Sequence, residues 1–202
     1  MRRPWEARGA SPPEAGSRSA RLRNGAALGT HEIGFSRAGG RLVVEVAADY
    51  TVKLAFVTLF RYRMRAREVW EGGLLQSARA STDVNGKLER VTLDRDGSEF
   101  AVEGSGARPY RAPANARLAT HWNLDQLAGP LINPQDGAIL RYAVSPRGRS
   151  PVRDAAGRTK DAERYVLTGD PPPLELWYDS DGIWSSLRAK AVDGSTIAYL
   201  AA

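Results

Sequence analysis

Apolar and polar residues alternate along most of the chain from about residue 27 onward, which is the period of a β-strand. Residues 31–35 alternate in this way, and Gly39-Gly40 turns the chain into a second apolar run at 42–46. Asn85-Gly86 is the strongest hairpin signal, because both residues tolerate the positive φ of a type I′ turn. Similar glycine-containing turns follow the later runs, so the pattern predicts strands that pair with their neighbours in sequence.

The pattern as a whole predicts an all-β fold with about ten or eleven strands in a single large, curved antiparallel sheet. The strands form a meander, as in a half-barrel or open barrel, because most links are short and a Greek-key sandwich needs long connections. The apolar stretch 51–71 is long for one strand, and a bend is expected near Ala55, while 147–161 is predicted as a polar loop or hairpin tip.

Two segments depart from the strand pattern. Residues 115–127 predict a short helix that ends before Gly129-Pro130, and we expect the segment 112–133 to pack across the open side of the sheet. Residues 1–20 are rich in Pro, Gly, Arg and Ser, which predicts a disordered tail before a single domain over 21–202.

The net charge of +6 is concentrated near the N-terminus. Six arginines and two glutamates give residues 1–25 a balance of +4, which leaves +2 for all the others. The charge therefore predicts no nucleic-acid partner. No segment approaches the roughly 18 apolar residues of a spanning helix, and residues 26–28 are too short for the core of a signal peptide.

The sharpest alternation lies between Phe60 and Trp70. In an extended strand the large apolar side chains share one face, namely Phe60, Tyr62, Met64 and Trp70. The arginine ladder (Arg61, Arg63, Arg65 and Arg67) then occupies the other face, which must meet water because burying four guanidinium groups is too costly. The ladder has two interpretations: a solvated convex face paired with acids such as Glu45 or Glu71, or a patch for anionic partners.

The aromatic face also has two interpretations. It is either packed core or, on a curved sheet, the wall of a concave apolar cavity. Tyr and Trp suit such walls because they combine an apolar body with a polar tip. The residues predicted to bind a ligand there are Phe60, Tyr62, Met64, Trp70, Trp122, Trp177 and Trp184.

The common catalytic motifs are missing from the sequence. There is no Gly-x-Ser-x-Gly, phosphate loop or dinucleotide fingerprint, and the chain has no cysteine and only two histidines. Neither a metal site nor a cofactor is therefore predicted. His31 lies on an apolar strand face and is predicted to be a core histidine.

The densest group of chemically capable residues is 120–123. His121 is a candidate general base, with Asn123 beside it and Asp125 or Asp136 to orient the imidazole. The alternative is that His121 and Asn123 bond to the backbone while the segment covers the open side of the sheet.

Several landmarks together resemble an uncharacterised bacterial family, a domain of unknown function with β-rich, exported members. The landmarks are Gly29–Phe35, Glu68–Leu74, Thr120–Asn123, Leu176–Asp179, Trp184 and Asp193-Gly194. The resemblance covers about residues 20–202. It implies a fold similar in outline to lipoprotein-carrier-like half-barrels, which hold acyl chains on a concave face, and it implies no catalytic residues.

The resemblance also implies a periplasmic or secreted location, although no signal peptide is visible. Members open with a signal peptide and a first strand, whereas here only the short run 19–23 precedes the turn at 25–31. Our hypothesis is that residues 1 to about 18 replace a lost leader through a misassigned start. Finding Met1 intact on protein from the cytosol would defeat this hypothesis.

The leading functional prediction is non-enzymatic binding of an apolar or amphiphilic, lipid-like molecule on the concave face. One alternative is a hydrolase-like enzyme centred on His121. The other is an interaction module that uses the arginine ladder to dock an acidic partner.

Overall fold

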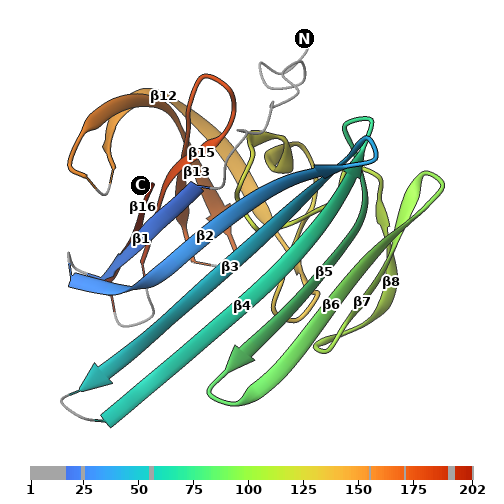
Figure 1. Cartoon of the computed structure of the whole chain (residues 1–202), viewed down its shortest axis with the longest axis horizontal. Coiled ribbons are helices and arrows are strands. Elements are labelled where there is room, and N and C mark those ends of the chain that lie inside the picture. Colours follow the sequence, from blue (N-terminus) through green and yellow to red (C-terminus); the bar gives the residue numbers. More distant parts are fainter. Residues whose placement is uncertain are drawn as a thin grey trace.

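The chain forms one large antiparallel sheet in a computed structural model that describes residues 17–23, 26–54, 57–154, 156–170, 172–190 and 194–201. The sheet has 13 strands in the order β12-β13-β14-β15-β16-β1-β2-β3-β4-β5-β6-β7-β8 (Figure 1). Their bounds are β1 Ser17–Arg23, β2 Ala26–Ala38, β3 Arg41–Leu54, β4 Val57–Glu71, β5 Leu74–Val84, β6 Lys87–Asp96, β7 Glu99–Gly104, β8 Ala107–Pro113, β12 Tyr142–Arg153, β13 Thr159–Gly169, β14 Leu174–Tyr178, β15 Trp184–Lys190 and β16 Thr196–Ala201.

The topology is a meander, which confirms the predicted fold class. Consecutive strands pair from β1 to β8 and from β12 to β16, and β1 pairs with β16 to join the two runs. Asn85 and Gly86 have φ of 53° and 92°, as expected for the tight β5–β6 turn.

The large sheet has more strands than predicted because β1 and β8 were not expected. The stretch 51–71 spans two strands: its first residues form the end of β3, and the remainder is β4, with Leu54 pairing with Val57. The predicted bend at Ala55 lies outside the described residues. The chain also enters the sheet earlier than predicted: Ser17–Arg23 form β1, while residues 1–16 of the predicted tail are not described.

The hairpin interpretation of 147–161 is correct, but its strands reach further than expected. β12 extends to Arg153 and β13 begins at Thr159. The short tip is closed by Asp154, whose carboxylate accepts hydrogen bonds from the backbone N and the Nε of Arg158 at 2.9 and 2.7 Å.

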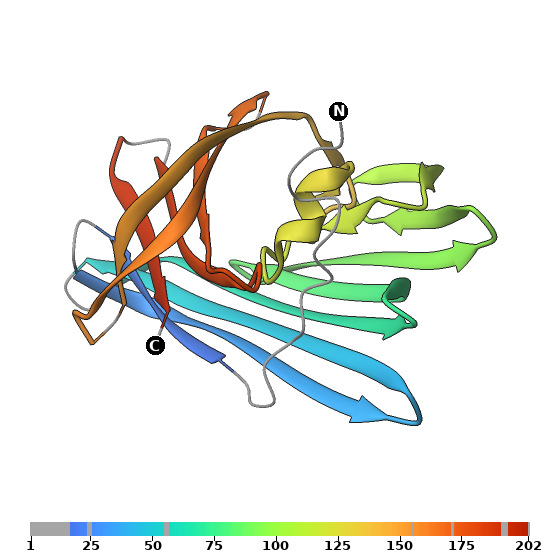
Figure 2. The same ribbon diagram turned by 90° about the horizontal axis from the view of Figure 1, so that it is seen from above.

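The sheet curls, and the segment between β8 and β12 lies across its concave face (Figure 2). This crossing segment (residues 114–141) contains a small sheet of β9 (Arg117–Leu118), β10 (Leu131–Ile132) and β11 (Ile139–Leu140). Its helix η1 is a 3₁₀ helix over Leu124–Ala128, much shorter than the predicted 115–127. The reason is that Arg117 and Leu118 pair with β10 and are therefore extended.

The crossing segment is bonded to both halves of the curled sheet. On one side, Tyr110 Oη donates to the Gly137 carbonyl at 2.8 Å. On the other side, the Trp184 backbone N donates to the Trp122 carbonyl at 3.1 Å. The segment therefore encloses one apolar core, which draws buried residues from β2–β8, from β13–β15 and from the segment itself.

Prolines occur in both edge strands of the large sheet. β8 and β12 are the edge strands; β8 contains Pro109 and Pro113, and β12 contains Pro146 and Pro151. Proline cannot donate to a further strand, so these edges oppose intermolecular pairing.

No helix within the described residues has the length and apolarity to cross a bilayer.

Gly29 on β2 is required by a close strand approach. A Cβ at this position would lie 2.0 Å from the Asp49 carbonyl oxygen and 2.7 Å from Tyr50 Cβ. We expect Gly29→Ala to lower the free energy of unfolding by about 2 kcal/mol, because β2 and β3 must separate. Gly34→Ala on the same strand is the control, since its new Cβ meets only Glu45 O at 3.9 Å. Equal urea midpoints for the two variants would contradict this expectation.

Candidate functional site

The alternation along β4 has the predicted orientation. Met64 is 5% exposed on the concave face, whereas all four residues of the arginine ladder are exposed on the other face. Asp49 on β3 lies 3.6 Å from Arg63 and 3.5 Å from Arg65. Glu45 lies 3.9 Å from Arg67. These contacts match the first interpretation of the ladder, a solvated face, for Arg63, Arg65 and Arg67. Glu71, the other acid expected beside the ladder, pairs instead with Arg41 at 3.4 Å. Such exposed pairs contribute little to stability.

A cavity of about 330 Å³ lies between the concave face and the crossing segment. The sheet contributes His31, Ala48, Tyr50, Tyr62, Met64, Trp184, Leu187, Ala189, Ile197 and Tyr199 to its lining. The crossing segment contributes Ala119, Thr120, His121, Asn133, Pro134, Gln135 and Leu140. None of these described lining residues is an aspartate, glutamate, lysine or arginine.

The structure brings together three of the predicted ligand-binding residues. Tyr62, Met64 and Trp184 line the cavity. Phe60 does not line the cavity. Its ring lies 5.8 Å, between centroids, from the ring of Tyr50, and Tyr50 does line the cavity.

Trp70 and Trp122 occupy a different place, around the buried carboxylate of Glu68. The two indole rings are 5.5 Å apart in an edge-to-face contact, and the space left between the neighbouring side chains is only about 10 Å³. These two tryptophans are therefore packed against the core and leave no room for a ligand beside them.

Glu68 is the most deeply buried carboxylate of this site, with 2% of its surface exposed. Its Oε2 accepts hydrogen bonds from Trp70 Nε1 at 3.0 Å and Trp122 Nε1 at 2.9 Å, and its Oε1 accepts one from Thr120 Oγ1 at 2.7 Å. Burial raises the pKa of Glu68 above its ordinary value, and the three donors oppose this rise. Glu68 thus connects β4 to the crossing segment through hydrogen bonds with Thr120 and Trp122, which are more than 50 residues away in the sequence.

The positive charge of Arg117 acts on this carboxylate and favours its ionised form. Its guanidinium lies 5.1 Å from the Trp70 ring centroid and donates to the carbonyls of Ala114 and Ala116 at 3.0 and 2.8 Å. Burial lowers the pKa of Arg117, and the charge of Glu68 opposes that effect. Arg117 therefore compensates the charge of Glu68 through space, without a direct ion pair.

His121 lies between the two residues that bond to Glu68, and it lines the cavity. Its φ is 64°, a left-handed conformation that is uncommon for a residue other than glycine. Its backbone N donates to Gln126 Oε1 at 3.1 Å, and its Nδ1 is buried without a hydrogen-bond partner. Burial lowers the pKa of His121 to about 4, so the imidazole is neutral at physiological pH.

Within the described residues, His121 is not bonded to either of the carboxylates predicted to orient it. Asn123 is 4% exposed and forms an isolated antiparallel β-bridge with Ile183. Burial raises the pKa of Asp125. No hydrogen bond or ion pair joins the His121 ring to Asp125 or Asp136 within the described part of the chain. The described residues also contain no group of three or more His, Cys, Asp or Glu placed to hold a metal ion.

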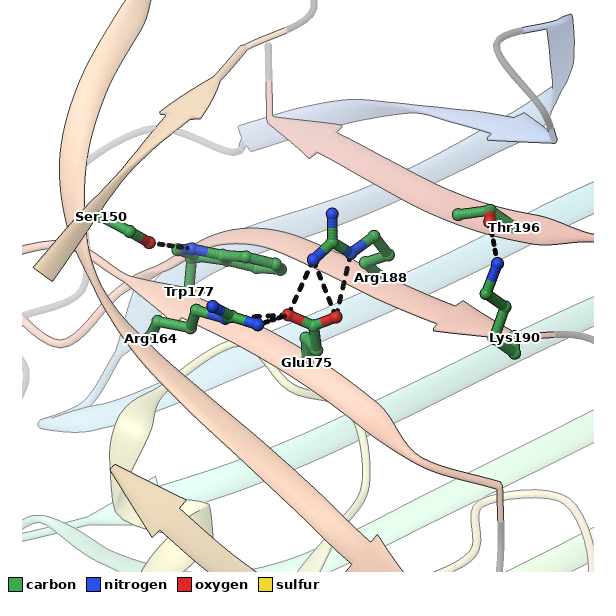
Figure 3. A network of polar contacts seen from close by, with 7 residues as sticks. All are labelled: Ser150, Arg164, Glu175, Trp177, Arg188, Lys190 and Thr196. Carbon is green, nitrogen blue, oxygen red and sulfur yellow. Dashed lines mark hydrogen bonds and ion pairs between the residues drawn. The ribbon is translucent and has the colours of Figure 1, made fainter. Parts of the chain in front are cut away.

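Trp177 lies on the opposite face of β14 from its neighbours Leu176 and Tyr178. It packs in a separate small cluster with Val152 and Ala162, and its Nε1 donates to Ser150 Oγ at 2.8 Å (Figure 3). Trp177 therefore lies outside the cavity that Tyr62, Met64 and Trp184 line.

Charged groups surround Trp177 on that outer face. The guanidinium groups of Arg164 and Arg188 lie 5.6 and 5.5 Å from its ring centroid. Both arginines bond to the carboxylate of Glu175 between them, as Figure 3 shows. This network covers the outside of the sheet and holds β13, β14 and β15 together.

Sequence reasoning did not identify several residues of the site. The position of Glu68 on the concave face could be predicted from the sequence, because Glu68 follows Met64 by an even number of positions. Tyr50 carried the same signal on β3. Thr120 belongs to the cluster predicted at 120–123, and Tyr199 to the aromatic residues expected on the inward face. Their contacts with Glu68 and His31 could not be predicted, because these contacts depend on how distant parts of the chain meet.

The curled open sheet, with a segment tied across its concave face and a small cavity beneath, defines a β-barrel-like protein. The chain belongs to the family described as a domain of unknown function, DUF6134, which matches residues 21–202. This confirms the predicted resemblance to an uncharacterised β-rich family.

Among solved structures, the chain is similar to a β-barrel-like protein of the domain of unknown function DUF1849 from Brucella abortus. The TM-score is 0.60 at 9% sequence identity, with 93% of this chain and 96% of that chain covered. This similarity concerns the fold alone. A DUF1089 family protein from Pseudomonas aeruginosa is also similar, with 13% identity, 86% and 89% coverage and a TM-score of 0.37, too low to carry an argument. No curated protein matches the chain in sequence.

Proposed function

We propose that the protein binds an apolar or amphiphilic small molecule in the cavity on its concave face, without chemical conversion. The observation that carries the proposal is the cavity itself: about 330 Å³, lined by apolar and aromatic side chains with a few polar groups from the crossing segment. Concave, mostly apolar pockets of roughly 300 to 1,000 Å³ are the usual form of small-molecule sites.

The binding energy would come from burial of apolar surface. Each methylene group removed from water contributes about 0.8 kcal/mol, so a ligand of modest size gains affinity without many polar contacts. The hydrogen bonds that fix the crossing segment support this proposal, because a wall held in place in advance reduces the entropy lost on binding.

Filling the cavity should abolish binding. Ala48 is 4% exposed and lines the cavity, so in Ala48→Phe the new ring would occupy the space of the ligand. We expect the affinity for the uncharged fluorescent probe N-phenylnaphthylamine to fall at least about tenfold, or ~1.4 kcal/mol. Fluorescence titration measures this effect, and circular dichroism verifies that the variant is folded.

Ala47→Phe is the matched control, since it adds the same ring one residue earlier on β3. Ala47 lies on the other face, where it lines an open hollow of about 650 Å³ that has room for a ring. We expect this variant to bind the probe like the unmodified protein. If folded Ala48→Phe keeps full affinity, the cavity is not the binding site.

The extracytoplasmic location implied by the family resemblance is also a proposal. A carrier of apolar molecules would be useful between membranes, where such molecules are poorly soluble. Fractionation of native cells, with the N-terminus of the mature protein determined, tests the location.

A further inference from the structure

Aromatic and heteroaromatic rings dominate the cavity wall. Six described lining residues carry an aromatic or heteroaromatic ring, namely His31, Tyr50, Tyr62, His121, Trp184 and Tyr199. They come from five strands of the sheet and from the crossing segment, so the rings surround the space from several directions.

The rings on the sheet form two ordered groups. On β3 and β4, Tyr50 and Tyr62 are stacked, with centroids 4.7 Å apart and an interplanar angle of 22°. On β2, β15 and β16, His31 contacts Trp184 at 5.5 Å and Tyr199 at 5.4 Å, both edge-to-face. The cavity wall therefore already contains both kinds of ring packing, a stacked pair in the first group and edge-to-face contacts in the second.

We infer that the ligand contains a planar ring system, aromatic or conjugated, and is not a simple alkyl chain. This inference rests on the proposed function and names the class of molecule that the cavity takes. A flat ring gains from stacked and edge-to-face contacts, each of which strengthens an aromatic pair about two- to tenfold beyond the area buried.

The size of the space agrees with a ring compound. A cavity of about 330 Å³ is near the lower end of small-molecule sites and is too small to enclose a lipid with two long chains. A flexible chain would lose conformational freedom in this space, whereas a rigid ring system has little to lose.

Two alcohols of similar hydrophobicity test the inference on the full-length protein. Para-phenylphenol has two rings and one hydroxyl group, and n-octanol has an alkyl chain and one hydroxyl group. We expect calorimetric titration to show at least about tenfold tighter binding of para-phenylphenol. Equal affinities, or tighter binding of n-octanol, would overturn the inference while leaving the proposed function intact. Failure of both alcohols and of N-phenylnaphthylamine to bind would instead overturn the proposed function.

Variants of Tyr62 separate ring contacts from simple burial. Tyr62→Leu removes the ring and keeps an apolar side chain, so we expect about fivefold weaker binding of para-phenylphenol and unchanged binding of n-octanol. Tyr62→Phe keeps the ring and should preserve the preference for para-phenylphenol. If Tyr62→Leu weakens both alcohols equally, or Tyr62→Phe loses the preference, ring recognition by this wall is refuted.

Discussion

Replacing Glu68 with leucine is expected to lower the free energy of unfolding at pH 7 by about 4 kcal/mol. Leucine would leave Trp70 Nε1, Trp122 Nε1 and Thr120 Oγ1 buried without an acceptor. Each unsatisfied buried donor costs roughly 1–3 kcal/mol, and the gain from removing a buried charge offsets only part of this loss. Urea denaturation followed by tryptophan fluorescence measures the change.

Glu68→Gln is the matched control for this variant. Its carbonyl oxygen can accept from both indole groups while its amide faces Thr120, so the connection between β4 and the crossing segment is kept. We expect Glu68→Gln to stay within about 1 kcal/mol of the unmodified protein at pH 4.5. A leucine variant as stable as the glutamine variant would show that these hydrogen bonds do not hold the crossing segment.

The glutamine variant also gives the sign of the pH dependence. The pKa of Glu68 is raised in the folded protein, so folding favours the protonated form of this carboxyl group. The corresponding stability is fully present below the unfolded pKa of 4.5 and is lost as the pH rises through the folded value. Relative to the unmodified protein, Glu68→Gln should therefore gain stability between pH 4.5 and 7.

Acidification is expected to destabilise the protein through His121 by about 3 kcal/mol between pH 6.5 and 4. The pKa of His121 falls from 6.5 to about 4 on folding because the ring is buried. The unfolded chain therefore binds a proton more readily, so the stability from the neutral imidazole is complete above pH 6.5 and declines as the pH falls towards 4. Urea denaturation across this range measures the decline.

His121→Asn removes this titration and tolerates the local backbone. Asparagine adopts positive φ more readily than most residues, which suits the φ of 64° at this position. The stability of His121→Asn should be compared with that of His121 in proteins that both carry Glu68→Gln. Otherwise the titration of nearby Glu68, which changes stability with pH in the opposite direction, would mask the effect of His121. Parallel stability curves with and without His121 would show that its imidazole is not desolvated by folding.

These two groups connect stability to the proposed binding site. Glu68 bonds to Thr120 and Trp122, and the residue between them, His121, lines the cavity. The buried carboxylate thus fixes the part of the crossing segment that forms one wall of the cavity. Loss of this connection should loosen the wall before the large sheet itself unfolds, since most strand pairs do not depend on Glu68.

The sequence by itself determined the local geometry of the strands. Alternation along β4 placed Met64 inward and the arginine ladder outward, and Asn85-Gly86 set a tight turn between β5 and β6. Both follow from the two-residue period of an extended chain and from the positive φ of the turn. Strict alternation also places Glu68 on the apolar face, so this carboxylate could be found from the sequence, although its partners could not.

Only the tertiary structure decided which inward side chains meet and where space remains between them. Trp177 shows the limit, because Leu176, Trp177 and Tyr178 are all buried and an unbroken apolar run does not say which face is concave. Trp122 shows the same limit over a longer distance, since its bond to Glu68 joins positions 54 residues apart. Periodicity fixes the face on which a side chain lies, whereas its partners depend on the curl of the whole sheet and on the path of the segment that crosses it.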